Sequence, residues 1–582
     1  MTSAQSRELS YDDGECSQFV ETPCPSCSNF VAVRFSIPEG IPSASITAVR
    51  FYYQAPGQTD IHITGTNITK DLIAPISYSV SAQGWQSVDI SGVSVDGDFY
   101  VMLRQRLGSA GADYWADGGR TYVAENPGTL NPWDRGDAMI RATIVPEIHV
   151  GADQKFKTIQ AGVDAASPGV PVIVHDGTYV ENIKVDKSIS IKSLNGAATT
   201  IVMAADLDKP VFTVAADQAT ISDFTLQNAN VNGSGGVGIY LDSADGCNIS
   251  QNKFSNLDIG IDVAGSSSSD IIDGNEFSGN VSAIQIEGTG SQVTGNYIHG
   301  NTGSTGSAIA LAASASANVI HFNRILKNSE DSQSGQAIYN ENGAEKVNAV
   351  LNWWGSATGP HNANSNPTGK GDTVGSGVSF KPWLQVAPVA VESKTMDGTP
   401  SDTLDAKVKT STQVTKTGGG SPTVWVASFS EDPGGVFPTS AIGKWVDVYF
   451  DSTSSVEQVE VRLFYSASDV ANLDESLLRL HWWDGSKWAV CSDSGVNKTE
   501  DYIWARLDAK STPGLNDLAG TLFAGGTVKA GFAWWWIVFV LLGVLVLIVL
   551  IVIGRSIMGR RSRTYRPARG YSGYRRYRGY QG

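Results

Sequence analysis

Acid–base chemistry in this chain would depend on a group of aspartates and two histidines in its middle third. These are Asp242, Asp245, Asp258, Asp262, Asp270, Asp273, His299 and His321. Hydrolysis or proton abstraction needs an acid and a base that face each other across the substrate. The aspartates do not recur at one position of the sequence pattern and mostly fall in predicted turns, and the histidines have no evident partner. The pattern favours solvated turn carboxylates over a catalytic pair.

A second set of side chains is better suited to binding than to catalysis. Aromatic rings stack on flat apolar faces such as those of sugar rings, while Arg, Asp and Gln form directional hydrogen bonds with hydroxyls or carboxylates. The candidates for carbohydrate binding are Tyr240, Asp262, Gln285, Tyr297, Arg324, Tyr339 and Trp353. The neighbouring Lys253 and Glu276 are also compatible with a plain surface ion pair worth less than about 1 kcal/mol.

Whether these residues share a face depends on a repeat. Asparagines recur at intervals of 23, 21, 27 and 29 residues, at Asn252, Asn275, Asn296, Asn323 and Asn352. Two positions after each stands an apolar residue: Phe254, Phe277, Ile298, Ile325 and Trp354. Alternation at period two within each repeat indicates strands, and the longer period indicates one turn of a parallel β-helix.

The repeat predicts which side chains point inward. Successive coils stack about 4.8 Å apart, so the five asparagines should form one hydrogen-bonded ladder at a bend that needs left-handed backbone geometry. Trp354 shares the inward row of Phe254 and should close the last coil, whereas Trp353 should point outward. At the front, Phe156–Ala166 has helical periodicity and should cap the first coil.

The segments "VIVHDGTYVENIKVDKSISIKSLNG" and "NWWGSATGP…FKPWL", together with the asparagine repeat, resemble the right-handed parallel β-helix proteins of the pectate-lyase-like superfamily. Within that superfamily the chain resembles especially the carbohydrate-binding and sugar-hydrolase repeat group and the NosD-like periplasmic proteins. It implies a β-helix over about Ile148–Leu384, but that superfamily contains lyases, hydrolases, adhesins and structural proteins. The Gly-His-Gly of its polygalacturonase-like hydrolases is missing here.

The β-helix is flanked by shorter alternating segments. We expect an N-terminal, jelly-roll-like β-sandwich over 1–146, the β-helix over 147–387, a polar linker over 388–422, a membrane-proximal β-sandwich over 423–512 and a stalk over 513–531. The tryptophans in "HWWDGSKW" are interpreted as cross-strand packing around a hairpin turn. No cofactor is predicted: Asp12 and Asp13 are compatible with calcium, but no ligand set supports it.

The C-terminus predicts an anchor. Phe532–Ile553 is an uncharged run of 22 residues, which as a helix would be about 33 Å long and would cross a bilayer. The tail 554–582 contains nine arginines and no acid, which places it in the cytoplasm and the large N-terminal part outside. The tail should bind anionic lipid; nucleic acid is a disfavoured partner. The start "MTSAQSRELSYDDGE" shows no export signal.

The cysteines fall into two groups. Cys16, Cys24 and Cys27 cluster near the start, and a local disulfide with one thiol left over is favoured over a zinc or redox site. Cys247 and Cys491 are expected to be isolated and buried.

Taken together, the sequence predicts a mainly β, acidic chain of net charge −16, with a right-handed parallel β-helix between two β-sandwiches and one C-terminal transmembrane helix. The favoured hypothesis is a non-catalytic, membrane-anchored prokaryotic surface protein whose β-helix binds polysaccharide or serves in adhesion. The alternatives are a polysaccharide lyase or glycoside hydrolase that acts on polysaccharide, including uronate-containing polysaccharide, and a purely architectural surface-layer component.

Overall fold

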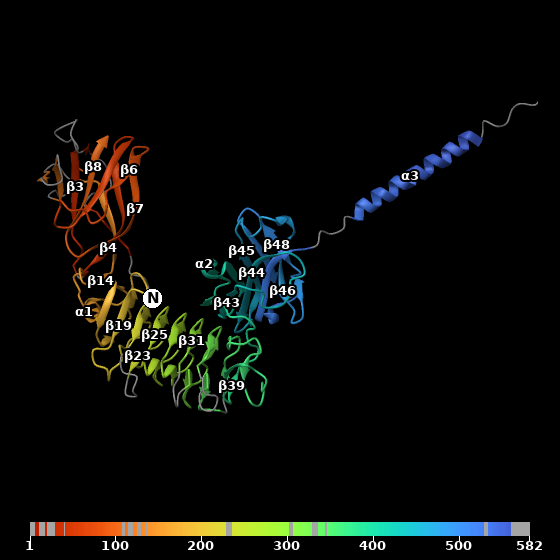
Figure 1. Cartoon of the computed structure of the whole chain (residues 1–582). Coiled ribbons are helices and arrows are strands. Elements are labelled where there is room, and N and C mark those ends of the chain that lie inside the picture. The colour runs from red at the N-terminus through yellow and green to blue at the C-terminus, as the bar shows by residue number, and fades with distance from the viewer. Residues whose placement is uncertain are drawn as a thin grey trace, which may run out of the picture.

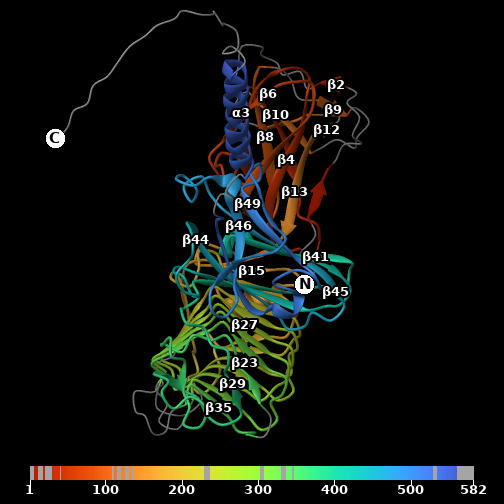
Figure 2. The same ribbon diagram turned by 90° about the vertical axis from the view of Figure 1, so that its right-hand side faces the viewer.

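A computed structural model describes residues 6–10, 18–19, 29–39, 41–107, 111–113, 120–124, 130–133, 137–227, 236–301, 307–328, 336–343, 346–528 and 534–559. The chain forms an N-terminal module, a central solenoid and a C-terminal module, followed by a helix (Figure 1). Both modules rise from the same side of the solenoid, one at each end (Figures 1 and 2). The predicted cysteine cluster, the pair Asp12 and Asp13 and the part of the arginine-rich tail after Gly559 lie outside the described residues.

The N-terminal module consists of antiparallel sheets. One has the order β1 (Arg7–Leu9), β13 (Ile140–Pro146), β4 (Ala44–Tyr53) and β7 (Gly84–Val95). The second has the order β11 (Asn131–Pro132), β10 (Thr121–Ala124), β3 (Asn29–Phe35), β8 (Phe99–Leu107), β5 (Gly57–Thr64) and β6 (Ile76–Val80). A small third sheet contains β12 (Asp137–Ala138), β9 (Gly111–Asp113) and β2 (Gln18–Phe19). Alternate residues such as Val31, Val33 and Phe35 of β3 enter a shared core because successive side chains of a strand point to opposite faces.

The solenoid is built from three parallel sheets, which we name S1, S2 and S3. S1 contains β14 (Ile148–Val150), β15 (Val172–Val174), β18 (Ser190–Ser193), β21 (Thr220–Ser222), β24 (Asn248–Ser250), β27 (Ile271–Asp273), β30 (Gln292–Thr294), β33 (Val319–His321), β36 (Val347–Asn348) and β39 (Val378–Ser379). S2 contains β16 (Gly177–Val180), β19 (Thr200–Met203), β22 (Thr225–Gln227), β25 (Lys253–Ser255), β28 (Glu276–Ser278), β31 (Tyr297–His299) and β34 (Arg324–Leu326). S3 contains β17 (Ile183–Val185), β20 (Phe212–Val214), β23 (Val237–Leu241), β26 (Ile259–Val263), β29 (Ser282–Ile286), β32 (Ile309–Leu311) and β35 (Ile338–Asn340). The prediction of a mainly β chain with a parallel β-helix is confirmed.

The five repeated asparagines lie in one buried column at the bend between S1 and S2. The backbone N–H of Asn275 donates to Oδ1 of Asn296 at 2.9 Å, and its own Nδ2 donates to the same oxygen at 3.1 Å. The same pair of bonds links Asn296 to Asn323. The residue before each asparagine has a positive φ of 56° to 64°: Gln251, Gly274, Gly295, Phe322 and Leu351. Left-handed geometry is unfavourable for Phe and Leu, so the ladder holds the bend in place.

A second asparagine column at the bend between S2 and S3 was not predicted. Asn280 donates through Nδ2 to Oδ1 of Asn301 at 2.9 Å, and Asn301 donates in the same way to Asn328 at 2.9 Å. Asp372 ends this column by accepting from the backbone and the side chain of Asn328, both at 3.0 Å. Two polar ladders therefore hold adjacent coils together inside an otherwise apolar core.

The ends of the solenoid are closed as the repeat required. Helix α1 (Ile159–Ala165) begins after Thr158, whose side chain accepts from the N–H of Ala161, and it buries Ile159 and Val163. It is shorter than the predicted Phe156–Ala166 because Phe156 forms a β-bridge with Val150 instead. At the other end Trp354 is fully buried. The short strands β37 (Pro360–His361) and β38 (Gly371–Thr373) pair beyond it.

The C-terminal module contains two antiparallel sheets around one core. Sheet C1 has the order β40 (Ala390–Thr395), β43 (Thr423–Phe429), β44 (Ala441–Phe450), β50 (Ala519–Thr527), β46 (Leu478–Trp483) and β47 (Trp488–Val490). Sheet C2 has the order β41 (Ser401–Ala406), β42 (Thr412–Gly418), β45 (Val456–Phe464), β49 (Tyr502–Leu507) and β48 (Ser494–Asn497). The remaining short elements are α2 (Lys407–Thr410), η1 (Glu475–Leu477) and η2 (Leu515–Asp517).

The structure differs from the predicted linker over 388–422 and the predicted stalk over 513–531. The linker region forms β40, β41 and β42, and the stalk region contributes β50, which lies inside sheet C1. These strands need few apolar residues to pack against the core, because only alternate positions, such as Leu404 and Val414, enter it. Even Lys416 is buried, and its Nζ donates to the carbonyls of Thr399 and Gly418 at 2.8 and 3.1 Å.

Sheet C1 packs against the solenoid through an aromatic cluster. Trp425 of β43 lies in a core group with Phe322 and Leu351 of the solenoid. Gly520, with φ of +96°, permits this approach, since a Cβ there would come within 2.9 Å of the Leu351 side chain. The C-terminal module is therefore seated on the asparagine bend of the last coils.

Helix α3 (Trp534–Gly559) follows the C-terminal module and extends away from it (Figure 1). Its side chains are described for residues 541–553 and for residue 555. Within the described residues, no helix is both long and apolar enough to cross a membrane.

Candidate functional site

Four of the predicted binding residues form one outward column on S3. Tyr240 of β23 lies beside Asp262 of β26, and Asp262 lies beside Gln285 of β29. Ala310 of β32 follows, and Tyr339 of β35 comes after it. Because parallel strands keep equivalent residues in register, neighbours in this column are separated by one coil, about 4.8 Å.

The S3 column runs into a groove of about 620 Å³. Ala310 has no atoms beyond Cβ and lies between Gln285 and Tyr339, so the column is hollowed at this coil. Tyr339 is 43 % exposed. The polar side chains in the lining are Ser282, Gln285, Glu287, Ser307, Gln336, Tyr339 and Glu341. This lining offers amide, hydroxyl and carboxylate groups to a ligand, with no Lys, Arg or His among its described residues.

The S3 face is acidic, and burial changes the protonation of one of its carboxyl groups. Burial raises the pKa of Asp262 to about 6, and the charge of Glu287 adds to the rise. Burial also raises the pKa of Tyr240, with further contributions from Asp242, Asp262 and Glu287. Asp262 is thus a carboxyl group that exchanges its proton near neutral pH.

The S2 face carries the other predicted column. This column contains, from coil to coil, Lys253, Glu276, Tyr297 and Arg324. Trp353 continues it through an isolated β-bridge with Arg324. Lys253 Nζ lies 2.9 Å from Glu276 Oε2, and the Arg324 guanidinium lies 4.3 Å from the centre of the Tyr297 ring. Unlike the S3 column, this one is filled by contacts among its own members.

Trp353 was predicted to be available for stacking on a ligand. In the structure its ring is half-buried and packs against the aromatic cluster between the solenoid and sheet C1. Its environment depends on the docked C-terminal module, which the repeat pattern does not encode. Its neighbour Trp354 lies inside the last coil, as the inward row required.

Among the described residues, the two histidines of the acid–base set form no hydrogen bond or ion pair with its aspartates. Asp270 accepts from the N–H of Cys247 at 2.9 Å, and Asp273 accepts from Thr294 at 2.9 Å. His321 is buried with its ring 5.0 Å from that of Tyr449, and burial lowers its pKa to about 4. Within the described part of the chain, no cluster of three or more His, Cys, Asp and Glu could hold a metal ion.

Cys247 and Cys491 are free and buried, as expected. Burial raises the pKa of Cys247 to about 12 and raises that of Cys491 further. Thiols with raised pKa values are poor nucleophiles, so both residues act as core side chains. The paired rings of Trp483 and Trp488, 5.7 Å apart across the β46–β47 hairpin, likewise pack as predicted.

A histidine pair at the junction with the N-terminal module was missed. His149 Nδ1 lies 2.8 Å from His175 Nε2, and His149 Nε2 lies 2.6 Å from Glu147 Oε1. Ser45 of β4 also bonds to Glu147, so the chain of contacts joins the N-terminal module to the solenoid. Burial, and then the charge of His149, lower the pKa of His175. The signal in the sequence was the placement of His149 and His175 at neighbouring positions of successive coils.

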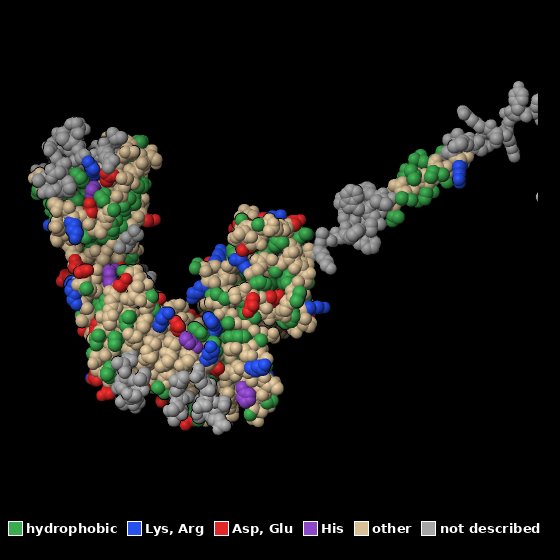
Figure 3. Space-filling model, in the orientation of Figure 1, with side chains coloured by type: hydrophobic (Ala, Val, Ile, Leu, Met, Phe, Trp, Pro, Cys, Tyr) green, Lys and Arg blue, Asp and Glu red, His purple; other side chains and the backbone are tan. Residues whose placement is uncertain are grey.

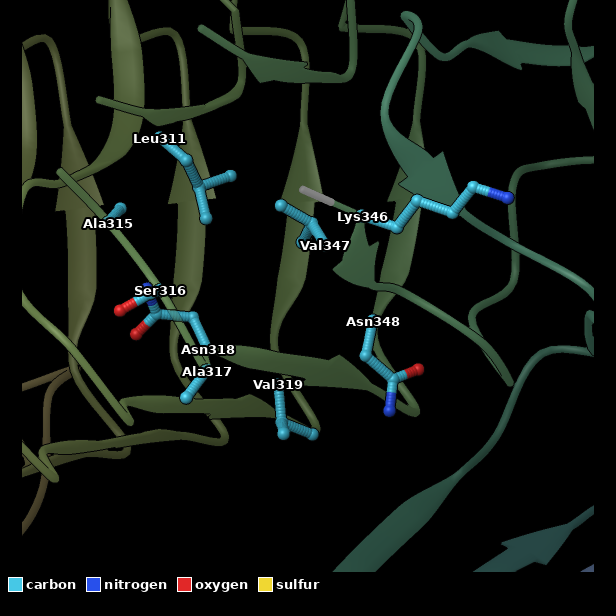
Figure 4. Close-up of a pocket in the computed structure, with 9 residues that line it drawn as sticks. All are labelled: Leu311, Ala315, Ser316, Ala317, Asn318, Val319, Lys346, Val347 and Asn348. Atoms are coloured by element: carbon cyan, nitrogen blue, oxygen red, sulfur yellow. The ribbon is translucent and has the colours of Figure 1, made fainter. Parts of the chain in front are cut away.

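A smaller cavity of about 240 Å³ lies between Ala315–Val319 and Lys346–Asn348 (Figure 4). Most of its lining is apolar, and the Lys346 side chain points away from it (Figure 4). None of the predicted binding residues contributes to it.

Residues 214–357 match the family described as "Right handed beta helix region". The chain is also similar to a cell surface glycoprotein of Methanothermus fervidus, with 33% identity over 110 residues. That match covers 19% of this chain and 17% of the relative, so the chain spans about one-sixth of that protein.

Three solved structures are distantly similar. The catalytic unit of an α-1,3-glucanase from Streptomyces thermodiastaticus is 10% identical, with 60% of this chain and 73% of that chain covered and a TM-score of 0.26. Alginate lyase from Paenibacillus sp. is 14% identical, with 36% of this chain and 75% of that chain covered and a TM-score of 0.27. The A-module of the mannuronan C-5 epimerase AlgE6 from Azotobacter vinelandii is 14% identical, with 33% of this chain and 59% of that chain covered and a TM-score of 0.23. Similarity at this level carries no argument about activity.

Proposed function

We propose that this chain is a cell-surface protein whose β-helix binds a glycan along S3 without cleaving it. The observation that carries the proposal is the groove around Gln285, Ala310 and Tyr339, which offers an aromatic face and hydrogen-bonding groups from successive coils. Tyrosine rings stack on sugar faces, and amides and carboxylates bind hydroxyls. S3 lies on the side of the solenoid away from the two modules (Figures 1 and 2), so neither module obstructs the groove.

The surface location is supported by the similarity to a protein named as a cell surface glycoprotein. We propose in addition that the uncharged run Phe532–Ile553 anchors the chain in a membrane, with the arginine-rich tail against anionic lipid on the cytoplasmic side. Protease protection of the tail in intact cells, with the modules accessible to the protease, is the expected result.

A glycan array probed with the full-length chain in detergent micelles tests the binding. We expect wild-type protein to retain a subset of polysaccharides and Tyr339→Ala to lose about tenfold in affinity for them, since an aromatic contact contributes about 1 to 1.5 kcal/mol. Val180→Ala is the matched control because Val180 is also an exposed outward residue of the solenoid. Equal binding by Tyr339→Ala and wild type would exclude the groove.

One observation favours catalysis as a second candidate function. Asp262, with its pKa of about 6, lies next to the column position of Gln285 and near Glu287. A carboxylic acid poised near neutral pH beside a second carboxylate is the equipment of a glycoside hydrolase. New reducing ends released from an array-positive polysaccharide, and lost in Asp262→Asn, would establish this function in place of simple binding.

A further inference from the structure

The S2 face contains an arginine whose charge is not matched. Arg50 and Arg141 both pair with Glu8, and Arg462 and Arg506 both pair with Glu460. Arg324, by contrast, has no carboxylate within ion-pair distance in the described part of the chain, and its buried Nε has no hydrogen-bond partner there. In a chain of net charge −16, a half-buried cation without a counter-charge is a candidate site for an anion.

The acid of this column, Glu276, is already paired with other residues. Glu276 lies 2.9 Å from Lys253 Nζ and 3.4 Å from His299 Nε2. Burial acts to raise the pKa of Glu276, but its bonds to Lys253 and His299 outweigh that effect and the net shift is downward. Glu276 is therefore ionised and paired with Lys253, which leaves the charge of Arg324 uncompensated.

The guanidinium of Arg324 packs against an aromatic ring. It lies over the Tyr297 ring at 4.3 Å, and that ring is itself stacked on His299 with centroids 4.0 Å apart. A guanidinium packed over a ring can still donate through its N–H groups to a planar, two-pronged acceptor such as a carboxylate.

These side chains border a pocket of about 190 Å³ between S2 and the first residues of the C-terminal module. One wall contains Tyr297, Arg324 and Glu276, whose carboxylate is paired with Lys253. The other wall contains Pro388 and Val389, which is 66% exposed. Gly295 makes the closure possible: a Cβ there would come within 3.3 Å of the Val391 side chain. Lys, Arg and His side chains gather on the solenoid where this module rises (Figure 3).

We propose that this pocket binds the carboxylate of a uronate residue, with the Arg324 guanidinium paired to the carboxylate and the ring C–H groups against Tyr297 and Val389. The inference rests on the proposed glycan binding and assigns its charged component to S2. The neutral part of the same or another glycan would occupy the groove on S3. Arg324 and Tyr339 thus serve different parts of the ligand.

Calorimetric titration of the full-length protein in detergent micelles with tetragalacturonate, and with its methyl ester, tests the proposal. We expect wild type to prefer the acid over the ester. Arg324→Gln should bind tetragalacturonate about tenfold more weakly or worse, because a charge-assisted hydrogen bond is lost, and should no longer distinguish acid from ester. Arg324→Lys keeps the positive charge but loses the two-pronged guanidinium, so its affinity for tetragalacturonate should lie between those of wild type and Arg324→Gln.

Lys192→Gln is the matched control, because it removes the same charge from an exposed position on S1 of the same solenoid. It should stay within about twofold of wild type, as expected for a screened surface charge. Unchanged thermal unfolding would show that Arg324→Gln is folded.

Two results would overturn the site: no binding of tetragalacturonate to wild type, or equal affinity of wild type and Arg324→Gln. Such a result would leave the proposed glycan binding intact if Tyr339→Ala still weakened retention on the array. If the array also showed no retained glycan, the proposed function would fail as well.

Discussion

The two outward columns of the solenoid have the same backbone and opposite surface character. On S3, a small residue, Ala310, interrupts the column and leaves a groove bordered by carboxylates. On S2, Lys253, Glu276, Tyr297 and Arg324 contact each other and leave a positively charged end. Parallel stacking fixes where side chains stand, and the side chains decide whether a column becomes a groove or a stack.

The strongest way to disturb both faces at once is to break the ladder beneath them. Asn296→Leu removes the acceptor of two bonds from Asn275 and the donor to the carbonyl of Ile272. Buried groups left without partners cost about 1 to 3 kcal/mol each, so we expect a loss of about 3 to 6 kcal/mol in the free energy of unfolding, measured by urea denaturation.

Asn195→Leu is the control for the ladder. It makes the same change at an exposed site with one bond to Asp176, and it should cost less than about 1 kcal/mol. Equal effects of the two substitutions would mean that the buried column adds no more stability than a surface contact.

Filling the S3 groove should weaken binding at S3, leave binding at S2 unchanged and leave the fold intact. Ala310→Phe places a ring between Gln285 and Tyr339, and we expect affinity for array-retained neutral glycans to fall about tenfold or more as the groove is blocked. Thr213→Phe puts the same ring in the same column outside the groove and should leave affinity unchanged. If Ala310→Phe also abolished tetragalacturonate binding, the two faces would not be separate sites.

The interior of the solenoid could be predicted from the sequence because each coil contributes one residue to each inward row. Asn252 through Asn352 and the buried Trp354 follow from spacing alone. Asn280, Asn301 and Asn328 repeat with the same period and could have been recognised in the same way.

The outward features were harder to predict. The groove exists because the side chain of Ala310 ends at Cβ. The environment of Trp353 depends on the C-terminal module, which contacts it from elsewhere in the chain. The polar strands β40 to β42 resembled a linker because backbone pairing, which any sequence can supply, provides much of their order. Composition signals burial better than it signals hydrogen bonding.

The two faces should respond to pH in opposite directions. Folded Asp262 keeps its proton up to about pH 6, whereas an unfolded aspartate loses it near 3.8, so stability falls as pH rises through that window. Asp262→Asn removes this loss and should stabilise the protein above pH 6 by about 1 kcal/mol, after discounting for solvent screening.

On S2 the stability of the fold should change with pH in the opposite direction. The lowered pKa of Glu276 contributes stability above its unfolded value of 4.5, which is lost as pH falls. Glu276→Gln should therefore lower the urea midpoint at neutral pH and have no effect in acid. Parallel shifts of the two variants across the pH range would contradict the assignment of opposite environments to the two faces.

The smallest expected effect concerns Lys253, which is 53% exposed in its pair with Glu276. Lys253→Gln should change the free energy of unfolding by less than about 1 kcal/mol, and about 1 M salt should remove even that difference. Its effect on binding is indirect: Glu276 also lines the pocket of Arg324, and without Lys253 its charge would repel an incoming carboxylate. We expect tetragalacturonate affinity to fall about twofold in titrations at low salt. A loss greater than that of Arg324→Gln would make Lys253 the residue that holds the carboxylate, because repulsion from a partly exposed Glu276 cannot exceed the loss of a direct contact.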